Sequence, residues 1–200
     1  MATILTSLRN TVIAGVVLAV VLFIVLTQSG LAITSYGKDF WAYIFRYLHE
    51  GSGVMWIGLL WYFNFVQIPS MPKIPDEQKP AISKVIAPAA LFWFRWAAMS
   101  TLITGLITAH LNGDYLVDAL LLGTQTGGHA LIGVGMWIAI IMWFNVWFVI
   151  WPNQKKALGI VTVEPDVKAK AARTAMLFSR TNTMLSVPML LCMAGQSHLA

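Results

Sequence analysis

The stretch His49-Glu-Gly-Ser-Gly-Val-Met-Trp-Ile57 returns later in the chain as His129-Ala-Leu-Ile-Gly-Val-Gly-Met-Trp-Ile138. Each copy runs on to a Phe-Asn pair and then to a proline. The offset between the copies is 80 residues at the histidine (129 − 49) and 81 at the tryptophan (137 − 56), so one residue has been inserted between these points. Internal similarity over so long a period indicates a repeated structural unit, and here it predicts a helical hairpin that occurs twice.

The composition indicates an all-α integral membrane protein. Of the 200 residues, 58 % are hydrophobic and only 10 % are charged, whereas a soluble domain has about 25 % charged residues. The net charge of +5 is then best explained by loop charges that orient the chain in the lipid bilayer, so we expect no nucleic-acid partner. The single cysteine excludes an internal disulfide and any site built from several cysteines.

The distribution of apolar segments predicts five transmembrane helices, each with the roughly 20 apolar residues that a bilayer requires. Two hairpins form a four-helix bundle, and one further helix anchors the N-terminus. The predicted parts are an N-terminal transmembrane anchor at 1–30, a periplasmic connection at 31–47, the first helical hairpin at 48–110 and the second at 111–200.

The Lys and Arg residues predict the orientation in a bacterial inner membrane. Eleven of the 13 lie on the side of the N-terminus and of the loops 70–95 and 152–180, and two lie on the other side. Because cytoplasmic loops carry the excess of positive charge, this multi-pass chain is predicted to have its N-terminus in the cytoplasm and its C-terminus in the periplasm.

The four histidines are predicted to meet at the periplasmic end of the bundle. Each stands at the outer end of one bundle helix: His49, His110, His129 and His198. Imidazole binds haem iron, copper and zinc well, and helix bundles build such sites from facing helices. We therefore expect a ligand ring that holds haem b or, as the alternative, copper or zinc. The other interpretation is that these rings simply lie at the membrane interface.

Each copy of the repeat also has a glycine four residues after its histidine and a tryptophan further along. The glycine lies on the same helix face as the histidine, so it would let either a porphyrin or a neighbouring helix approach closely. The tryptophan could pack on a cofactor or fill the core of the bundle. These candidates are Gly53, Gly133, Trp56 and Trp137.

A second polar layer is predicted roughly 22 to 27 Å from the histidines, from a rise of about 1.5 Å per residue. It contains Arg95 and Arg180, with Asn64 and Asn145 in matching positions of the two halves. A charge inside a membrane segment is costly and suggests a functional site, here for an anion, a haem propionate or a quinone carbonyl. The alternative is that the arginines reach the cytoplasmic headgroups.

Several segments resemble the urate oxidase N-terminal domain, which is the membrane domain of bacterial urate hydroxylases. The resemblance covers roughly 45–198 and includes RYLHEGSGVMWIGLLWYFNFVQIPSM at 46–71 and ARTAMLFSRTNTMLSVPMLLCMAGQSH at 172–198. It implies a membrane redox module. In that family a cytochrome c domain follows and accepts electrons, and this chain has no Cys-x-x-Cys-His motif, so a separate periplasmic cytochrome c is the implied partner.

Three functions follow as hypotheses. The first is a b-type cytochrome-like electron-transfer subunit that acts with a periplasmic cytochrome c. The second is a non-catalytic accessory subunit that packs against other membrane subunits of a larger respiratory or photosynthetic complex. The third is a copper- or zinc-binding protein of the periplasmic face. No residue is predicted to be catalytic, and the sequence leaves open whether the chain is an enzyme.

Overall fold

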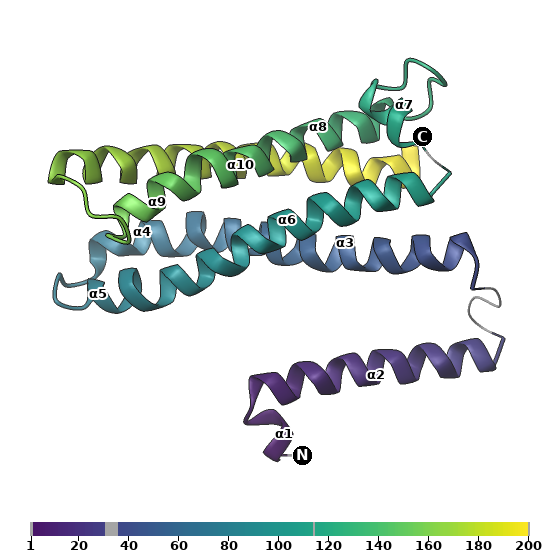
Figure 1. Ribbon diagram of the computed structural model, residues 1–200, viewed down its shortest axis with the longest axis horizontal. Helices are drawn as coiled ribbons and strands as arrows, with labels where there is room; N and C mark the ends of the chain where they lie inside the picture. The colour runs from purple at the N-terminus through teal and green to yellow at the C-terminus, as the bar shows by residue number, and fades with distance from the viewer. Residues whose placement is uncertain (1, 31–35, 114, 200) are drawn as a thin grey trace. The chain divides into compact units, whose positions relative to one another are not determined.

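The computed structural model describes residues 2–30, 36–113 and 115–199, and the side chains of these ranges except 2–3 and 197–199. The described residues form helices and connections, with no β-strand among them. The chain divides into two compact units, Met1–Trp41 and Ala42–Ala200, which are described separately (Figure 1). The predicted all-helical fold is therefore confirmed.

The first unit contains a short helix α1 (Ala2–Leu5) and the long apolar helix α2 (Leu8–Gln28). Ser7 caps α2, because its side chain accepts a hydrogen bond from the backbone N–H of Asn10. None of the residues of α2 is buried. Its length and composition suffice to cross a membrane, as predicted for an N-terminal anchor.

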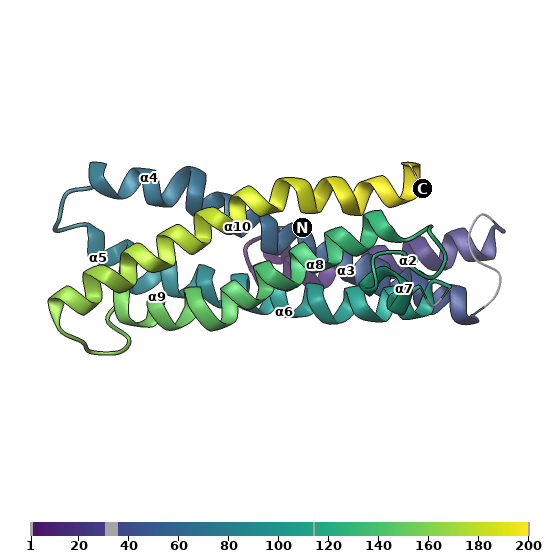
Figure 2. The same cartoon turned by 90° about the horizontal axis from the view of Figure 1, so that it is seen from above.

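The second unit consists of four long helical rods that run alongside one another in alternating directions (Figures 1 and 2). The first rod begins earlier than expected, since part of the predicted connection 31–47 belongs to α3. The first rod consists of α3 (Lys38–Trp61), η1 (Tyr62–Gln67), α4 (Ile68–Ser70) and η2 (Met71–Lys73), and the second of α5 (Lys79–Ala81), η3 (Ile82–Ile86) and α6 (Ala87–Leu111). The short helix α7 (Leu116–Leu120) lies between the second and third rods in the chain. The third rod consists of α8 (Ala130–Phe144), η4 (Asn145–Ile150) and α9 (Trp151–Ala157), and the fourth is α10 (Pro165–Leu199).

Three described helices, not the predicted five, are long and apolar enough to cross a membrane. They are Leu8–Gln28, Lys79–Leu111 and Ala130–Ala157. The rod that begins with α3 and the rod formed by α10 are not apolar enough, because polar residues lie along them. Charged side chains occupy the first turns of α3, and the first half of α10 carries Lys168, Lys170, Arg173 and Arg180.

Prolines explain why three of the rods widen into π-helix. The segments η1, η3 and η4 end at residues 67, 86 and 150, each two positions before a proline. A proline lacks an N–H group, and its ring clashes with the carbonyl of the residue four positions earlier. A wider turn relieves that clash. The prolines are Pro69, Pro88 and Pro152, and the first and third belong to the repeat.

A row of buried polar side chains on α10 bonds to two neighbouring rods. Ser179 accepts a hydrogen bond from the Asn64 side-chain amide at 2.8 Å, and Ser186 accepts one from the Trp61 indole at 3.0 Å. Asn182 accepts from Asn145 at 2.8 Å and donates to the Met142 carbonyl at 2.9 Å. The row consists of Ser179, Asn182 and Ser186, spaced three and four residues apart on one helix face, so it joins α10 to the first and third rods.

Glycines allow α8 to lie close to two neighbours. A Cβ atom on Gly133 would overlap the carbonyl oxygen of Ala119 in α7, and one on Gly135 would lie 3.0 Å from the Cβ atom of Cys192 in α10. The single cysteine is buried in this contact. Small residues thus set the spacing of these helices, as is common between membrane helices.

We expect Gly133→Ala to lower the free energy of unfolding by about 1–3 kcal/mol, because α7 must move away from the added methyl group. Thermal unfolding in detergent micelles measures the effect. Gly51→Ala is the matched control, since a Cβ atom there meets nothing within 4 Å and alanine favours helix. Equal melting temperatures for the two variants would contradict the close approach of α7 and α8.

We expect Asn182→Ala to cost about 1–3 kcal/mol, because the side chain is fully buried and its loss leaves the Asn145 amide without its acceptor. Combining it with Asn145→Ala should cost less than the sum of the two single changes. Thr181→Ala, at an exposed neighbouring position, is the control. Additive losses across the double-mutant cycle would rule out the interaction between the two amides.

Candidate functional site

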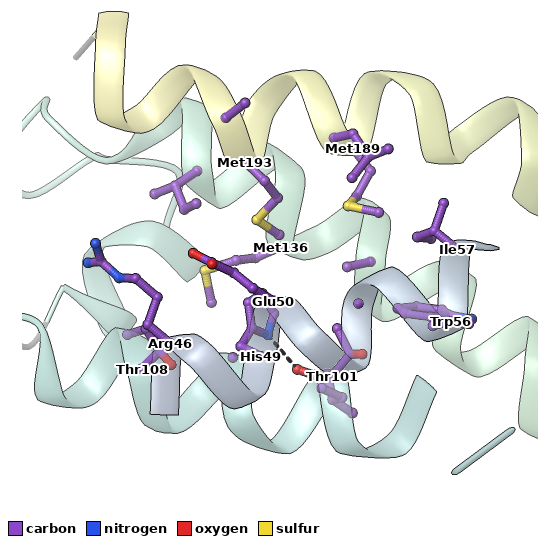
Figure 3. Close-up of a pocket in the computed structure, with 18 of the residues that line it drawn as sticks. Arg46, His49, Glu50, Trp56, Ile57, Thr101, Thr108, Met136, Met189 and Met193 are labelled. Atoms are coloured by element: carbon purple, nitrogen blue, oxygen red, sulfur yellow. Dashed lines mark hydrogen bonds between the residues drawn. The ribbon is translucent and has the colours of Figure 1, made fainter. Parts of the chain in front are cut away.

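A cavity of about 970 Å³ lies among α3, α6, α8 and α10 in the second unit (Figure 3). Most of its lining side chains are apolar. It follows α3 from Arg46 to Trp61, a length of about 22 Å for 15 residues of helix. Its size is at the upper end of the range for small-molecule and cofactor sites.

His49 lies on the α3 wall with a fixed tautomer. Its Nδ1 atom is 2.9 Å from the backbone carbonyl oxygen of Thr101 on α6 (Figure 3). Because a carbonyl only accepts hydrogen bonds, Nδ1 carries the hydrogen and Nε2 keeps its lone pair. A backbone carbonyl orients metal-bound histidines in the same way. The ring lies against Gly105, where a Cβ atom would come within 2.8 Å of the ring carbon Cε1.

Three thioether side chains line the walls formed by α8 and α10. They are Met136 on α8 and Met189 and Met193 on α10 (Figure 3). Sequence reasoning missed them, because methionines spaced four residues apart on an apolar helix are typical of ordinary core packing. No signal in the sequence alone would have separated them from the other methionines.

Polar side chains are grouped at the end of the cavity nearest α7. We call this group the polar rim: Arg46, Glu50, Asn112, Tyr115 and Gln196. Gln196 holds its place by accepting a hydrogen bond from the backbone N–H of Ile132 and donating one to the Gly128 carbonyl. Burial raises the pKa of Tyr115, while the nearby Arg46 cation acts in the opposite direction.

The predicted ring of four histidines is not seen among the side chains that the structure describes. Of the three histidines whose side chains the structure describes, only His49 lines the cavity. His110 is exposed at the end of α6, and the side chain of His198 lies outside the described residues. The Nδ1 atom of His129 is 2.8 Å from the Asp118 carboxylate, and its ring stacks on Tyr115. In the described part of the chain no three His, Cys, Asp or Glu residues could hold a metal ion.

Asp118 is the organising residue of the loop between α7 and α8. Its nearly buried carboxylate accepts hydrogen bonds from the Thr126 hydroxyl, from the backbone N–H groups of Gln125 and Thr126, and from His129. These bonds, that from the Thr126 hydroxyl foremost, lower the pKa of Asp118 to about 2. The contact with Asp118 orients the imidazole of His129.

The two copies of the repeat differ in what their glycine and tryptophan do. Gly53 and Trp56 line the cavity, and Trp56 is only 1 % exposed. Gly133 instead meets α7. Trp137 is 45 % exposed, and its indole donates a hydrogen bond to the Leu120 carbonyl. Only in the first copy, therefore, do the glycine and the tryptophan both line the cavity.

The two arginines of the predicted polar layer lie in different environments. Arg95 is buried, its guanidinium carbon lies 3.3 Å from the centroid of the Trp151 ring, and its Nη1 atom has no hydrogen-bond partner among the described residues. Arg180 is exposed on α10. Neither arginine lines the cavity, and the matching Asn64 and Asn145 bond to α10. The two arginines do not form one site.

Comparison with known proteins supports the family resemblance over the second half of the chain. The family model described as urate oxidase N-terminal matches residues 115–200, which include α7 to α10 and five of the cavity-lining residues: Tyr115, Met136, Met189, Met193 and Gln196. The predicted resemblance is confirmed over this range. No curated protein and no solved structure matches the chain.

The depressed pKa of Asp118 predicts an acid-sensitive loop. The unfolded carboxyl titrates near pH 3.9, so the ionised group stabilises the fold above that pH, and this contribution is lost as the pH falls from about 4 to about 2. We expect Asp118→Asn to lower the melting temperature at pH 7 but to approach the wild type near pH 2. A difference that does not depend on pH would show that the charge of Asp118 contributes nothing.

Proposed function

We propose that the chain is a membrane-embedded redox subunit that holds a haem b in the cavity beside His49. The observation that carries this proposal is the pairing of a large apolar cavity with an imidazole whose Nδ1 is bonded to the Thr101 carbonyl and whose Nε2 is left with its lone pair. Haem iron is commonly held by such a histidine.

The residues of the cavity fit this group. Gly53 leaves room for a flat macrocycle on the α3 wall, and a Cβ atom there would meet only the Thr101 methyl group, at 3.9 Å. The apolar walls would exclude water from the iron. At the polar rim, Arg46 could bind a propionate. When bound, the haem would supply one-electron transfer at its iron.

We further propose that all five long helices cross a bacterial inner membrane, with the N-terminus in the cytoplasm and the C-terminus in the periplasm. The hydrogen bonds that Ser179, Asn182 and Ser186 form with neighbouring rods support this for α10, since polar groups in a membrane must be satisfied internally. The excess of Lys and Arg at one end supports the orientation.

The electron acceptor in this proposal is a periplasmic cytochrome c. The support is indirect: the urate oxidase N-terminal match, together with the position of the polar rim at the bundle end where α3 begins and α10 ends (Figure 1). In the proposed orientation this end faces the periplasm. A haem there would lie near the surface on which a soluble redox partner docks.

A second candidate function is that of an accessory subunit of a larger respiratory or photosynthetic membrane complex. Helix α2 favours it, because this helix is apolar along its length and none of its residues is buried, so it could pack against another membrane subunit. Native electrophoresis in mild detergent addresses this candidate. Migration at the mass of the single chain would count against it.

We expect the purified wild-type protein to give a b-type reduced-minus-oxidised spectrum, and His49→Ala to lose the bound haem. His110→Ala, at an exposed position outside the cavity, should keep the full haem content and serves as the control. A wild type without haem, or a His49→Ala variant with undiminished haem, would overturn the assignment. Elemental analysis in the same samples would reveal copper or zinc instead of iron.

A further inference from the structure

The walls that face α3 across the cavity offer few atoms that could bind a metal. Among the side chains that the structure describes, helices α8 and α10 contribute four to the cavity wall that carry N, O or S atoms: Met136, Met189, Met193 and Gln196. The Gln196 amide is already bonded to the backbone of Ile132 and Gly128. Within the described part of these two helices, the thioethers therefore remain as ligands for an iron that would bind His49.

His129, which begins the second copy of the repeat as His49 begins the first, was one of the four predicted ligands, and the sequence left open which histidines pair. In the structure the Nδ1 atom of His129 binds Asp118 and its ring stacks on Tyr115, with 5.1 Å between the ring centroids. His129 does not line the cavity.

Among the three methionines, Met193 is the least engaged by the core. Met136 is 9 % exposed within the small cluster around Ala109 and Ala119, and Met189 is 5 % exposed within the main core. Met193 is only half-buried and packs against both clusters. Its flexible thioether points from α10 into the cavity (Figure 3), and its methyl group lies 3.5 Å from the position that a Cβ atom on Gly135 of α8 would take.

Resting on the proposed function, we propose that Met193 supplies the second axial ligand of the haem, opposite His49. Thioether sulfur is a softer ligand than imidazole, and a methionine ligand raises the reduction potential of a haem relative to ligation by two histidines. The site would then hold a high-potential centre, which suits electron delivery to a soluble cytochrome c.

The test compares three isosteric variants in the full-length, haem-loaded protein: Met193→Leu, Met136→Leu and Met189→Leu. Exchange of methionine for leucine nearly conserves volume, so all three should fold. We expect Met193→Leu to retain haem but to lose the sulfur-to-iron charge-transfer absorption of the ferric form, and its midpoint potential should shift downward. The two other variants and His129→Ala should keep both signatures.

Other outcomes separate this inference from the function on which it rests. A haem-containing wild type whose ferric spectrum indicates two nitrogen ligands would overturn the role of Met193 and leave the haem proposal standing. Loss of the absorption in Met136→Leu or Met189→Leu, with Met193→Leu unchanged, would also overturn it. A wild type without haem contradicts the proposed function itself. In Met193→His the imidazole should replace the sulfur ligand that Met193→Leu lacks, so that the iron is again six-coordinate and its midpoint potential is lower than in the wild type. A variant without six-coordinate iron would contradict the position assigned to residue 193.

Discussion

The bond between the His49 ring and the Thr101 carbonyl, 2.9 Å long, sets how α3 lies beside α6. The ring occupies the space that a side chain at position 105 would need, so α3 contacts α6 there through an imidazole rather than through direct backbone packing. The cavity lies beside the ring, and the bond to Thr101 fixes the tautomer of the residue on which the proposed cofactor site depends.

Two rods of the second unit have modest hydropathy, and the burial of their polar side chains makes them compatible with a membrane location. The polar residues that lower the mean hydropathy of α10 form hydrogen bonds with Asn64, Trp61 and Asn145. Arg95 lies over an aromatic ring. A criterion based on composition counts such residues against a membrane span, although they are buried inside the bundle. By this criterion three of the described helices could cross a membrane, and the two rods whose polar side chains join the bundle do not qualify.

Periodicity and repeats predicted the rods, their order and the end of the bundle at which histidines gather, because these features depend on local spacing. They could not predict which histidine would face the cavity. His129 has the same sequence environment as His49, yet Asp118, eleven residues before it, binds its imidazole. Likewise, Met193 differs from a core methionine only in how much of it the neighbouring helices cover. Such outcomes depend on tertiary packing, and no local pattern in the sequence encodes them.

Within the repeat, α8 has one residue more than α3, and this residue is Gly135. The insertion breaks the equivalence of the two halves. One added residue turns everything after it by about 100° around the helix axis. Trp56 consequently points inward at 1 % exposure, while Trp137 lies at the surface at 45 %. The duplication thus gave rise to a pseudo-symmetric scaffold with an asymmetric interior, in which one half keeps the binding wall and the other supplies the facing side. The proposed site would therefore bind one cofactor per chain, however closely the two halves agree in sequence.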